Sequence, residues 1–291
     1  MVAEFIIPRL FRDQEEFRSV AIDDFSWIEY RQYQPQHCNR VLTTTPIFGV
    51  VLSGKKIIHS DNGELSFESG SGFFIPKGSY VMSEIPSSEK TYETLLFFIG
   101  DNFLESFLRD HYCGIKETIQ KPSTDSIFKI DISPLLQSSV QSALPYFLFD
   151  SSHTDKLIGL KMQEVLLNIT EADESGAFLS FLTHLNSERR RNLHQLIDEY
   201  YREPLTIEEF AALSGRSLSS FKRDFKKSFK NSPKRWINNR RLETARTLLI
   251  NSEKNISEIC FEVGFGNISY FSQLFKKKFG LSPSLLTKSR N

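Results

Sequence analysis

Short apolar runs that end at turn residues fill most of positions 20 to 100. Five of these runs are rich in β-branched and aromatic residues and are predicted as strands: 46–52, 55–59, 64–67, 72–75 and 93–99. The turns between them contain Gly, Pro, Asp or Asn and recur at short intervals. This pattern is typical of an all-β sandwich or barrel.

Helical spacing of apolar residues begins near Asn102 and returns at 134–149 and 154–170, after a polar stretch at 121–125. The segment 171–176 then carries charges and a glycine without an apolar period, so it is the best linker candidate. The chain is predicted to divide into three parts: a β-rich domain at 1–172, a linker at 173–186 and a helical domain at 187–291.

After Ser187 the predicted helices are short, and this part of the chain contains an internal repeat. Residues 219–233 recur fifty positions later as residues 269–283, and eight of the fifteen positions are identical. Further upstream the shift is forty-nine, so the turn of the second copy is one residue longer. The identical pairs are Ser219/Ser269, Phe221/Phe271, Phe225/Phe275, Lys226/Lys276, Lys227/Lys277, Phe229/Phe279, Ser232/Ser282 and Pro233/Pro283.

Each copy has the pattern of two short helices joined by a glycine turn. In the first copy, Thr206 and Glu209 have capping-box spacing, and Gly215 marks the end of the first helix. Gly264 stands at the break of the second copy. The second helix of each copy places three phenylalanines on one stripe and leaves a polar, basic face opposite.

Two such units, at about 206–229 and 256–279, are suited to docking in the major groove of DNA. The alternative is a helical bundle whose phenylalanines only pack and whose lysines are only solvated. One copy alone would favour that alternative. Two copies that both end in Lys-Lys-x-Phe-x-x-Ser-Pro favour a pair of helix-turn-helix units.

Residues 187–291 resemble the paired helix-turn-helix domain of the AraC/XylS family of bacterial transcription regulators. The segment 264–283, GFGNISYFSQLFKKKFGLSP, carries nearly every signature position of that family. The segment 232–242, with Trp236-Ile237 and Arg240-Arg241-Leu242, is similar to the long helix that joins the two units. The resemblance implies an α+β protein of two domains, in which the second helix of each unit enters one of two adjacent major grooves.

The resemblance also implies which side chains meet DNA. The implied base-reading residues are Ser219, Lys222 and Arg223 in the first unit, and Ile268, Ser269, Tyr270, Ser272 and Gln273 in the second. Independent chemistry agrees, because Arg and Lys can donate to guanine and Gln can pair with adenine. Phosphate contacts are expected from residues a turn further along or on the connecting helix: Lys226, Lys227, Lys276, Lys277, Lys278, Arg240 and Arg241. The two arginines have a second interpretation, as a solvated face of that helix.

Charge is distributed unevenly along the chain, although 36 basic and 36 acidic residues give a formal net charge of zero. Residues 1–186 carry 15 basic and 25 acidic side chains, a net of −10, so the remaining 21 basic and 11 acidic side chains give residues 187–291 a net of +10. This asymmetry points to a nucleic-acid or other anionic partner for the helical half, and a solvated basic face is the alternative.

The segment 70–79, GSGFFIPKGS, resembles the cupin-like barrel that precedes the DNA-binding part in many family members. Metal-dependent cupins need an H-x-H pair with a downstream Glu and a later His, whereas His37 and His59 lie far apart, so we expect no metal site. We find no Ser-His-Asp or Cys-His pairing, Walker loop or dinucleotide fingerprint, so we expect no catalytic residue and no cofactor. The three cysteines are scattered, which excludes a disulfide framework.

The sequence therefore predicts a DNA-binding transcription regulator, by family habit more often an activator, with double-stranded DNA and RNA polymerase as partners. Its barrel either encloses a small ligand or is filled by its own aromatic residues, in which case a protein partner is the effector. The helices at 134–149 and 154–170 either form a homodimer interface or pack on the barrel. The candidate contacts are Leu157, Leu160, Leu166 and Leu167.

Two other functions stay open at this point. One is a metal-independent cupin-like enzyme with an accessory helical domain, and the other is a non-specific nucleic-acid-binding protein. The unequal chemistry of the two recognition faces argues against the second. No apolar run approaches the ~20 residues of a membrane span, and the N-terminus lacks a secretory pattern. We therefore expect a soluble, cytoplasmic protein without a membrane partner.

Overall fold

The computed structural model describes residues 5–13, 17–22, 25–60, 63–112, 127–148, 153–187 and 190–288. The chain divides into two compact units between residues 189 and 190. We call the first the β-rich unit and the second the helical unit. The polar stretch 121–125 and Cys113 lie outside the described residues. In the part of the chain that is described, every helix is too short or too polar to cross a membrane.

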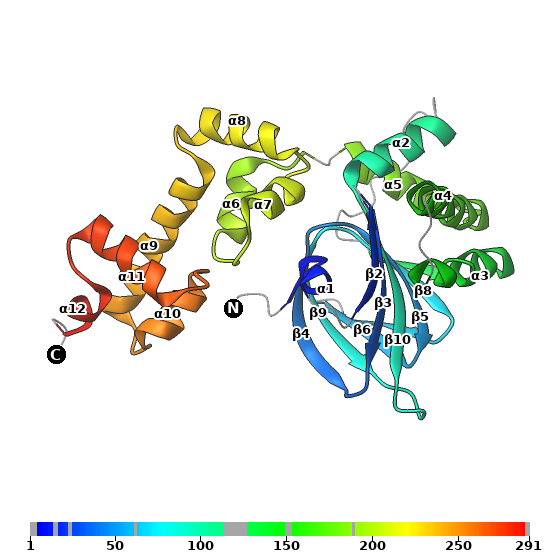
Figure 1. Cartoon of the computed structure of the whole chain (residues 1–291), viewed down its shortest axis with the longest axis horizontal. Helices are drawn as coiled ribbons and strands as arrows, with labels where there is room; N and C mark the ends of the chain where they lie inside the picture. Colours follow the sequence, from blue (N-terminus) through cyan, green and yellow to red (C-terminus); the bar gives the residue numbers. More distant parts are fainter. Residues whose placement is uncertain are drawn as a thin grey trace. The chain divides into compact units, whose positions relative to one another are not determined.

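Two sheets form the β-rich unit (Figure 1). Its described strands are β1 (Phe5–Ile7), β2 (Arg18–Ile22), β3 (Phe25–Gln32), β4 (Gln36–Thr43), β5 (Ile47–Ser53), β6 (Lys55–Ser60), β7 (Gly63–Glu68), β8 (Ser71–Ile75), β9 (Gly78–Ile85), β10 (Tyr92–Ile99) and β11 (Phe128–Asp131). The five-stranded sheet has the order β1-β4-β9-β6-β7, and the six-stranded sheet has the order β11-β8-β5-β10-β3-β2. β1 pairs with β4 in parallel, and the other pairings are antiparallel. The five strands expected from the sequence are confirmed as β5, β6, β7, β8 and β10.

Alternation of side chains along the six-stranded sheet creates a core on each of its faces. Trp27, Phe74 and Phe97 belong to the core that the helices cover. The adjacent Ile28 and Phe98 point the other way, into the core between the two sheets. Both faces of the sheet are therefore buried, which explains why its strands read as nearly continuous apolar runs.

Helices cover the outer face of the six-stranded sheet (Figure 1). They are α2 (Asp101–His111), α3 (Pro134–Gln141), the 3-10 helix Leu144–Phe147, α4 (Thr154–Ala172) and α5 (Ala177–Ser187). The short α1 (Arg9–Arg12) instead follows β1 and packs against it. These bounds confirm helices at the positions that the apolar spacing predicted.

Two expectations for this unit are corrected by the structure. The predicted linker at 173–186 is helix α5 over most of its length, and its Phe178 and Phe181 are buried against the sheet. The charged turn ends at Gly176, and Phe178, Phe181 and Leu182 beyond it have the spacing of a buried helix face. Leu166 is fully buried in the same core, so it is unavailable as a dimer contact, whereas Leu157 and Leu160 are exposed.

The helical unit is organised around one long helix (Figure 1). Its described helices are α6 (Leu193–Tyr200), α7 (Ile207–Leu213), α8 (Leu218–Phe229), α9 (Pro233–Asn251), α10 (Ile256–Glu262), α11 (Ile268–Phe279) and α12 (Pro283–Lys288). α6, α7 and α8 gather at one end of α9, and α10, α11 and α12 gather at its other end (Figure 1). The repeat of the sequence is thus a repeat of structure, with α9 joining the copies.

Gly264 lies in the turn between α10 and α11, with a φ of 92°, in the region that favours glycine. A Cβ atom there would lie 2.3 Å from the carbonyl oxygen of Arg202, which belongs to the loop after α6. The turn of the second copy is therefore in close backbone contact with the first half of the helical unit.

We expect Gly264→Ala to lower the free energy of unfolding of the full chain by at least about 2 kcal/mol, since it adds both backbone strain and a clash. Gly266→Ala is the matched control, because a Cβ there would meet no atom within 4 Å, and it should change stability by less than about 0.5 kcal/mol. Denaturant titration followed by circular dichroism measures both. Equal losses in the two variants would contradict the close contact.

Candidate nucleic-acid interface

The first helix-turn-helix unit consists of α7 and α8, and side chains cap both of its helices. Thr206 Oγ1 accepts a hydrogen bond from the Glu209 N–H at 3.2 Å, and the Glu209 carboxylate accepts from the Thr206 N–H at 2.8 Å. This is the predicted capping box. Ser217 Oγ then accepts from the Ser220 N–H at 3.3 Å and fixes the start of α8.

The second unit, α10 and α11, uses asparagine at the same places. Asn255 and Glu258 form a capping box with distances of 2.9 and 2.8 Å, which the sequence analysis did not identify. Asn267 Oδ1 accepts from the Tyr270 N–H at 2.8 Å and caps α11. The signal was present in the sequence, because Asn followed by Glu three residues later also satisfies the capping pattern.

The aromatic stripes decide which face of each second helix is turned to solvent. Phe221 and Phe225 of α8 are fully buried, with ring centroids 5.5 Å apart, and Phe271 and Phe275 of α11 repeat this at 5.7 Å. Since these stripes point inward, the opposite faces of α8 and α11 are exposed. The phenylalanine stripes of the sequence prediction are confirmed.

On α8, the three side chains with an implied base-reading role are all exposed: Ser219, Lys222 and Arg223. The Arg223 side chain is 74% exposed, and its guanidinium donates to Ser220 Oγ at 3.0 Å and to Asp224 Oδ1 at 3.3 Å. An exposed ion pair of this kind contributes little to stability, so the guanidinium can leave Asp224 for a stronger acceptor at low free-energy cost.

On α11, the corresponding face is less charged. Ile268, Ser269, Tyr270 and Gln273 are exposed, whereas Ser272 is half-buried. The Tyr270 hydroxyl accepts a hydrogen bond from Asn238 Nδ2 of α9 at 3.3 Å, which holds the ring near the start of the helix. The two units therefore present different chemistry at equivalent positions.

The lysines in the last turn of each second helix behave in two ways. Lys226, Lys227, Lys276 and Lys277 are exposed on α8 and α11. Lys278 instead donates to the carbonyl oxygen of Asn239 and pairs with a carboxylate of α9, both at 2.9 Å. The side chain therefore ties α11 to α9 in this structure, a role that the sequence did not predict.

The neighbouring arginines of α9 have opposite environments. Arg240 is exposed, with its guanidinium 5.6 Å from the ring centre of Tyr201. Arg241 is only 7% exposed, and it donates to three backbone carbonyls: Tyr201 at 2.6 Å, Glu203 at 2.6 Å and Gly264 at 2.9 Å. Burial lowers the pKa of Arg241 to about 10, so the side chain is still protonated at neutral pH.

Both sequence interpretations of Arg241 are therefore wrong. The side chain is buried, so it is neither part of a solvated face of α9 nor available to a phosphate. The loop after α6 belongs to the first half of the helical unit and Gly264 to the second, so Arg241 joins the two halves. A signal was available in the sequence. Arg241 lies on the same stripe of α9 as the buried Ile237, Ala245 and Leu249, at a spacing of four residues.

Arg216 is a second structural arginine that the sequence analysis missed. It lies in the turn of the first unit and donates to the carbonyl oxygens of Arg191 at 3.0 Å and Ser214 at 2.9 Å. Its Nε also pairs with Asp224 of α8 at 3.3 Å. The turn is thus held both to the segment before α6 and to α8.

The β-rich unit contains a side-chain cluster around His59 that the sequence did not predict. His59 Nδ1 lies 3.0 Å from Glu64 Oε1, and its Nε2 lies 2.8 Å from Ser83 Oγ and 3.9 Å from Cys38 Sγ. The sequence could not reveal this cluster, because pairing of β4, β9, β6 and β7 brings its members together. Ser83 is buried and its Oγ accepts the Cys38 N–H at 2.9 Å, which shields the hydroxyl from a substrate. Among the described residues, no three His, Cys, Asp or Glu side chains are placed to hold a metal ion.

Comparison with known proteins finds a matching family for each unit. Residues 46–181 match the family described as the ExsA N-terminal regulatory domain, and residues 210–289 match a helix-turn-helix domain family. The chain is 30% identical over 251 residues to the thermoregulatory protein LcrF of Yersinia pestis, covering 82% of this chain and 92% of LcrF.

Two further relatives have similar coverage. The virulence regulon transcriptional activator VirF of Yersinia enterocolitica is also 30% identical over 251 residues, covering 82% of this chain and 92% of VirF. The HTH-type transcriptional regulator ExsA of Pseudomonas aeruginosa is 26% identical over 236 residues, covering 81% of this chain and 83% of ExsA. The similarity therefore extends over both units and is not confined to the helical repeat.

The two arginines of α9 provide a matched pair of variants. We expect Arg241→Met to lower the free energy of unfolding by about 3 kcal/mol or more, because it removes charged donors from three carbonyls at once. Arg240→Met should change it by less than about 0.5 kcal/mol. Denaturant unfolding of the full chain measures both, and a loss at position 240 equal to that at 241 would contradict these environments.

Proposed function

The chain belongs to the AraC/XylS family of bacterial transcription regulators, and from this premise we propose that it activates transcription by reading two blocks of DNA with α8 and α11. The observation that carries the proposal is the repeated helix-turn-helix, in which both second helices bury aromatic stripes and expose polar faces. Two units on one rigid helix suit two successive major grooves on one side of the duplex.

We propose that the starts of the two helices read bases. Lys222 and Arg223 supply donors for guanine O6 and N7, and Gln273 can pair with adenine. Ile268 can contact the methyl group of thymine. Ser219, Ser269, Tyr270 and Ser272 complete the proposed base-reading set.

The proposed phosphate contacts are the lysines one turn further along α8 and α11, which are Lys226, Lys227, Lys276 and Lys277. Arg240 of α9 is the fifth proposed phosphate contact. Their exposure supports this role, since each is available for a phosphate oxygen. Contacts of this kind carry affinity without sequence preference and weaken as salt rises. The excess of basic residues after position 186 supports the same assignment.

The β-rich unit is the proposed regulatory part. An activating role would make RNA polymerase a partner, and it agrees with the similarity to VirF, a transcriptional activator. A homodimer through the exposed Leu157 and Leu160 of α4 is part of the proposal, and the effector is a small molecule or a protein. We further propose that the chain acts in the cytoplasm, where DNA is accessible, and has no enzymatic activity.

One pair of variants separates base reading from phosphate contact. Arg223→Ala should reduce affinity for an operator selected from random DNA by about 1–3 kcal/mol and relax preference at one or two base pairs. Lys276→Ala should weaken selected and scrambled DNA about equally and reduce the slope of affinity against salt by roughly one unit. Binding titrations of the full chain across a salt series measure both effects.

The selected operator itself is a further readout of the same experiment. We expect two blocks of unlike sequence about 10 bp apart, because the two recognition faces differ in chemistry. Lys254→Ala is the control variant, since its ammonium pairs with Glu262 at 2.7 Å and is not among the proposed contacts, and it should leave both DNA affinities unchanged. Equal affinity for selected and scrambled DNA would instead favour a non-specific nucleic-acid-binding protein.

A further inference from the structure

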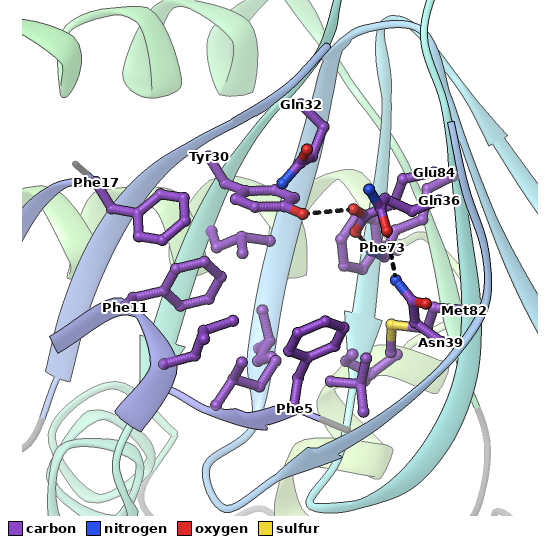
Figure 2. Close-up of a pocket in the computed structure, with 17 residues that line it drawn as sticks. Phe5, Phe11, Phe17, Tyr30, Gln32, Gln36, Asn39, Phe73, Met82 and Glu84 are labelled. Carbon is purple, nitrogen blue, oxygen red and sulfur yellow. Dashed lines mark hydrogen bonds and ion pairs between the residues drawn. The ribbon is translucent and has the colours of Figure 1, made fainter. Parts of the chain in front are cut away.

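A cavity of about 260 Å³ lies between the two sheets of the β-rich unit, at the end closed by the N-terminal segment (Figure 2). Phe5, Leu10, Phe11 and Phe17 from that segment form an apolar wall. All four precede the region 46–181 that matches the ExsA N-terminal regulatory domain. The cavity therefore depends on a part of the chain outside that match.

The wall is a packed aromatic cluster. The ring of Phe11 lies 5.0 Å from that of Phe17 and 5.4 Å from that of Tyr30, both edge to face. On the side of the cavity away from Phe11 and Phe17, Figure 2 shows polar side chains of Gln36, Asn39 and Glu84, and Gln32 lies beside Tyr30. The lining thus has an aromatic end and a polar end, which suits an amphipathic molecule.

The two charged residues of the lining neutralise each other. Lys56 Nζ lies 2.8 Å from Glu84 Oε1, and the two side chains are only 5% and 13% exposed. The rings of Phe73 and Tyr92 lie 5.7 and 5.8 Å from the same ammonium group, which adds cation–π stabilisation.

The second oxygen of the carboxylate is also occupied. Glu84 Oε2 accepts a hydrogen bond from the Tyr30 hydroxyl at 2.7 Å. Burial, with Glu84 beside it, raises the pKa of Tyr30 well above its ordinary value, so this hydroxyl remains a donor. A ligand carboxylate would have to displace Glu84 from Lys56 or lie beside a second negative charge, and a ligand cation would face Lys56.

The amide groups at the polar end can serve a neutral ligand. Asn39 Nδ2 donates to Gln36 Oε1 at 3.1 Å, and amide side chains offer both donors and acceptors. A hydroxyl or amide group can exchange hydrogen bonds with them without bringing charge into the cavity. A cavity of about 150 Å³ can hold benzene, which has six non-hydrogen atoms. At the same volume per atom, this cavity holds roughly ten non-hydrogen atoms.

We propose that this cavity binds a small, uncharged amphipathic molecule, with its apolar part against Phe11 and Phe17 and a hydroxyl or amide group at Gln36 and Asn39. Binding in the cavity does not depend on the proposed function, but its regulatory meaning rests on the proposed role of the β-rich unit. The internal Lys56–Glu84 pair makes the cavity select against carboxylates, although it contains a lysine.

Three probes of one chain length test the selectivity: octan-1-ol, octanoate and octylammonium. Calorimetric titration into the full chain at neutral pH should show octan-1-ol binding at least about tenfold more tightly than either ion, because an unpaired buried charge is costly. Val41→Phe, which fills the cavity from β4, should abolish octan-1-ol binding. Tighter binding of octanoate, no binding of octan-1-ol, or binding unaffected by Val41→Phe would overturn the proposal.

Variants of the ion pair test its cause. Glu84→Gln leaves Lys56 without its carboxylate and should reverse the order, so that octanoate binds more tightly than octan-1-ol. Because a half-removed buried pair can unfold the protein, the neutral double variant Lys56→Met/Glu84→Gln is examined as well, and it should keep the preference for octan-1-ol. Lys55→Met/Glu68→Gln is the control, since this solvent-accessible pair joins β6 to β7 at 3.0 Å, does not line the cavity and should change nothing.

DNA binding by the same preparation keeps the two proposals distinguishable. Selective octan-1-ol binding without recognition of any selected operator would leave the cavity assignment standing and reject the proposed function. Operator recognition without octan-1-ol binding would do the reverse.

Discussion

The arrangement of the helical unit depends on the buried guanidinium of Arg241. Its donors reach carbonyls of the loop after α6 and of Gly264, so one side chain joins α9 to the first half of the helical unit and to the turn of the second helix-turn-helix unit. A buried charge without partners costs several kcal/mol, so these segments stay together whenever the unit is folded. The close approach of Gly264 to Arg202 reinforces the same junction. The spacing of α8 and α11 is therefore a property of this junction as much as of the length of α9.

The β-rich unit also buries a cation, with the opposite consequence. Arg241 is satisfied mainly by neutral carbonyls, which hold backbone segments in place and leave its positive charge inside the protein. Lys56 is paired with the Glu84 carboxylate, and the pair as a whole is neutral. The first arrangement organises a surface for binding an anionic polymer, whereas the second removes charge from a cavity. The structural role of a buried cation is therefore set mainly by whether its partners are neutral carbonyls or a carboxylate.

The sequence predicted the elements well where the evidence was a repeat within the chain or a local run of apolar residues. The fifty-residue repeat identified both units, and short apolar runs that end at turn residues identified five strands. Assigning Arg240 and Arg241 to one role failed, because only the buried stripe of α9 distinguishes them. The cluster around His59 was invisible for a different reason, since strand pairing assembles it from distant positions. Which exposed residues touch DNA stays a prediction.

The difference between the two recognition faces has a physical consequence for how specificity is shared. α8 exposes Arg223, a strong donor that Asp224 and Ser220 keep oriented along the helix. α11 exposes Ile268 and Tyr270 at its start, and these side chains offer apolar and shape contacts with few donors. Hydrogen bonds from a guanidinium discriminate strongly against the wrong base, whereas contact with a thymine methyl discriminates less. We infer that Arg223 carries most of the base discrimination of the first unit, and that the second unit combines the hydrogen bonds of Gln273 with apolar contact from Ile268 and Tyr270.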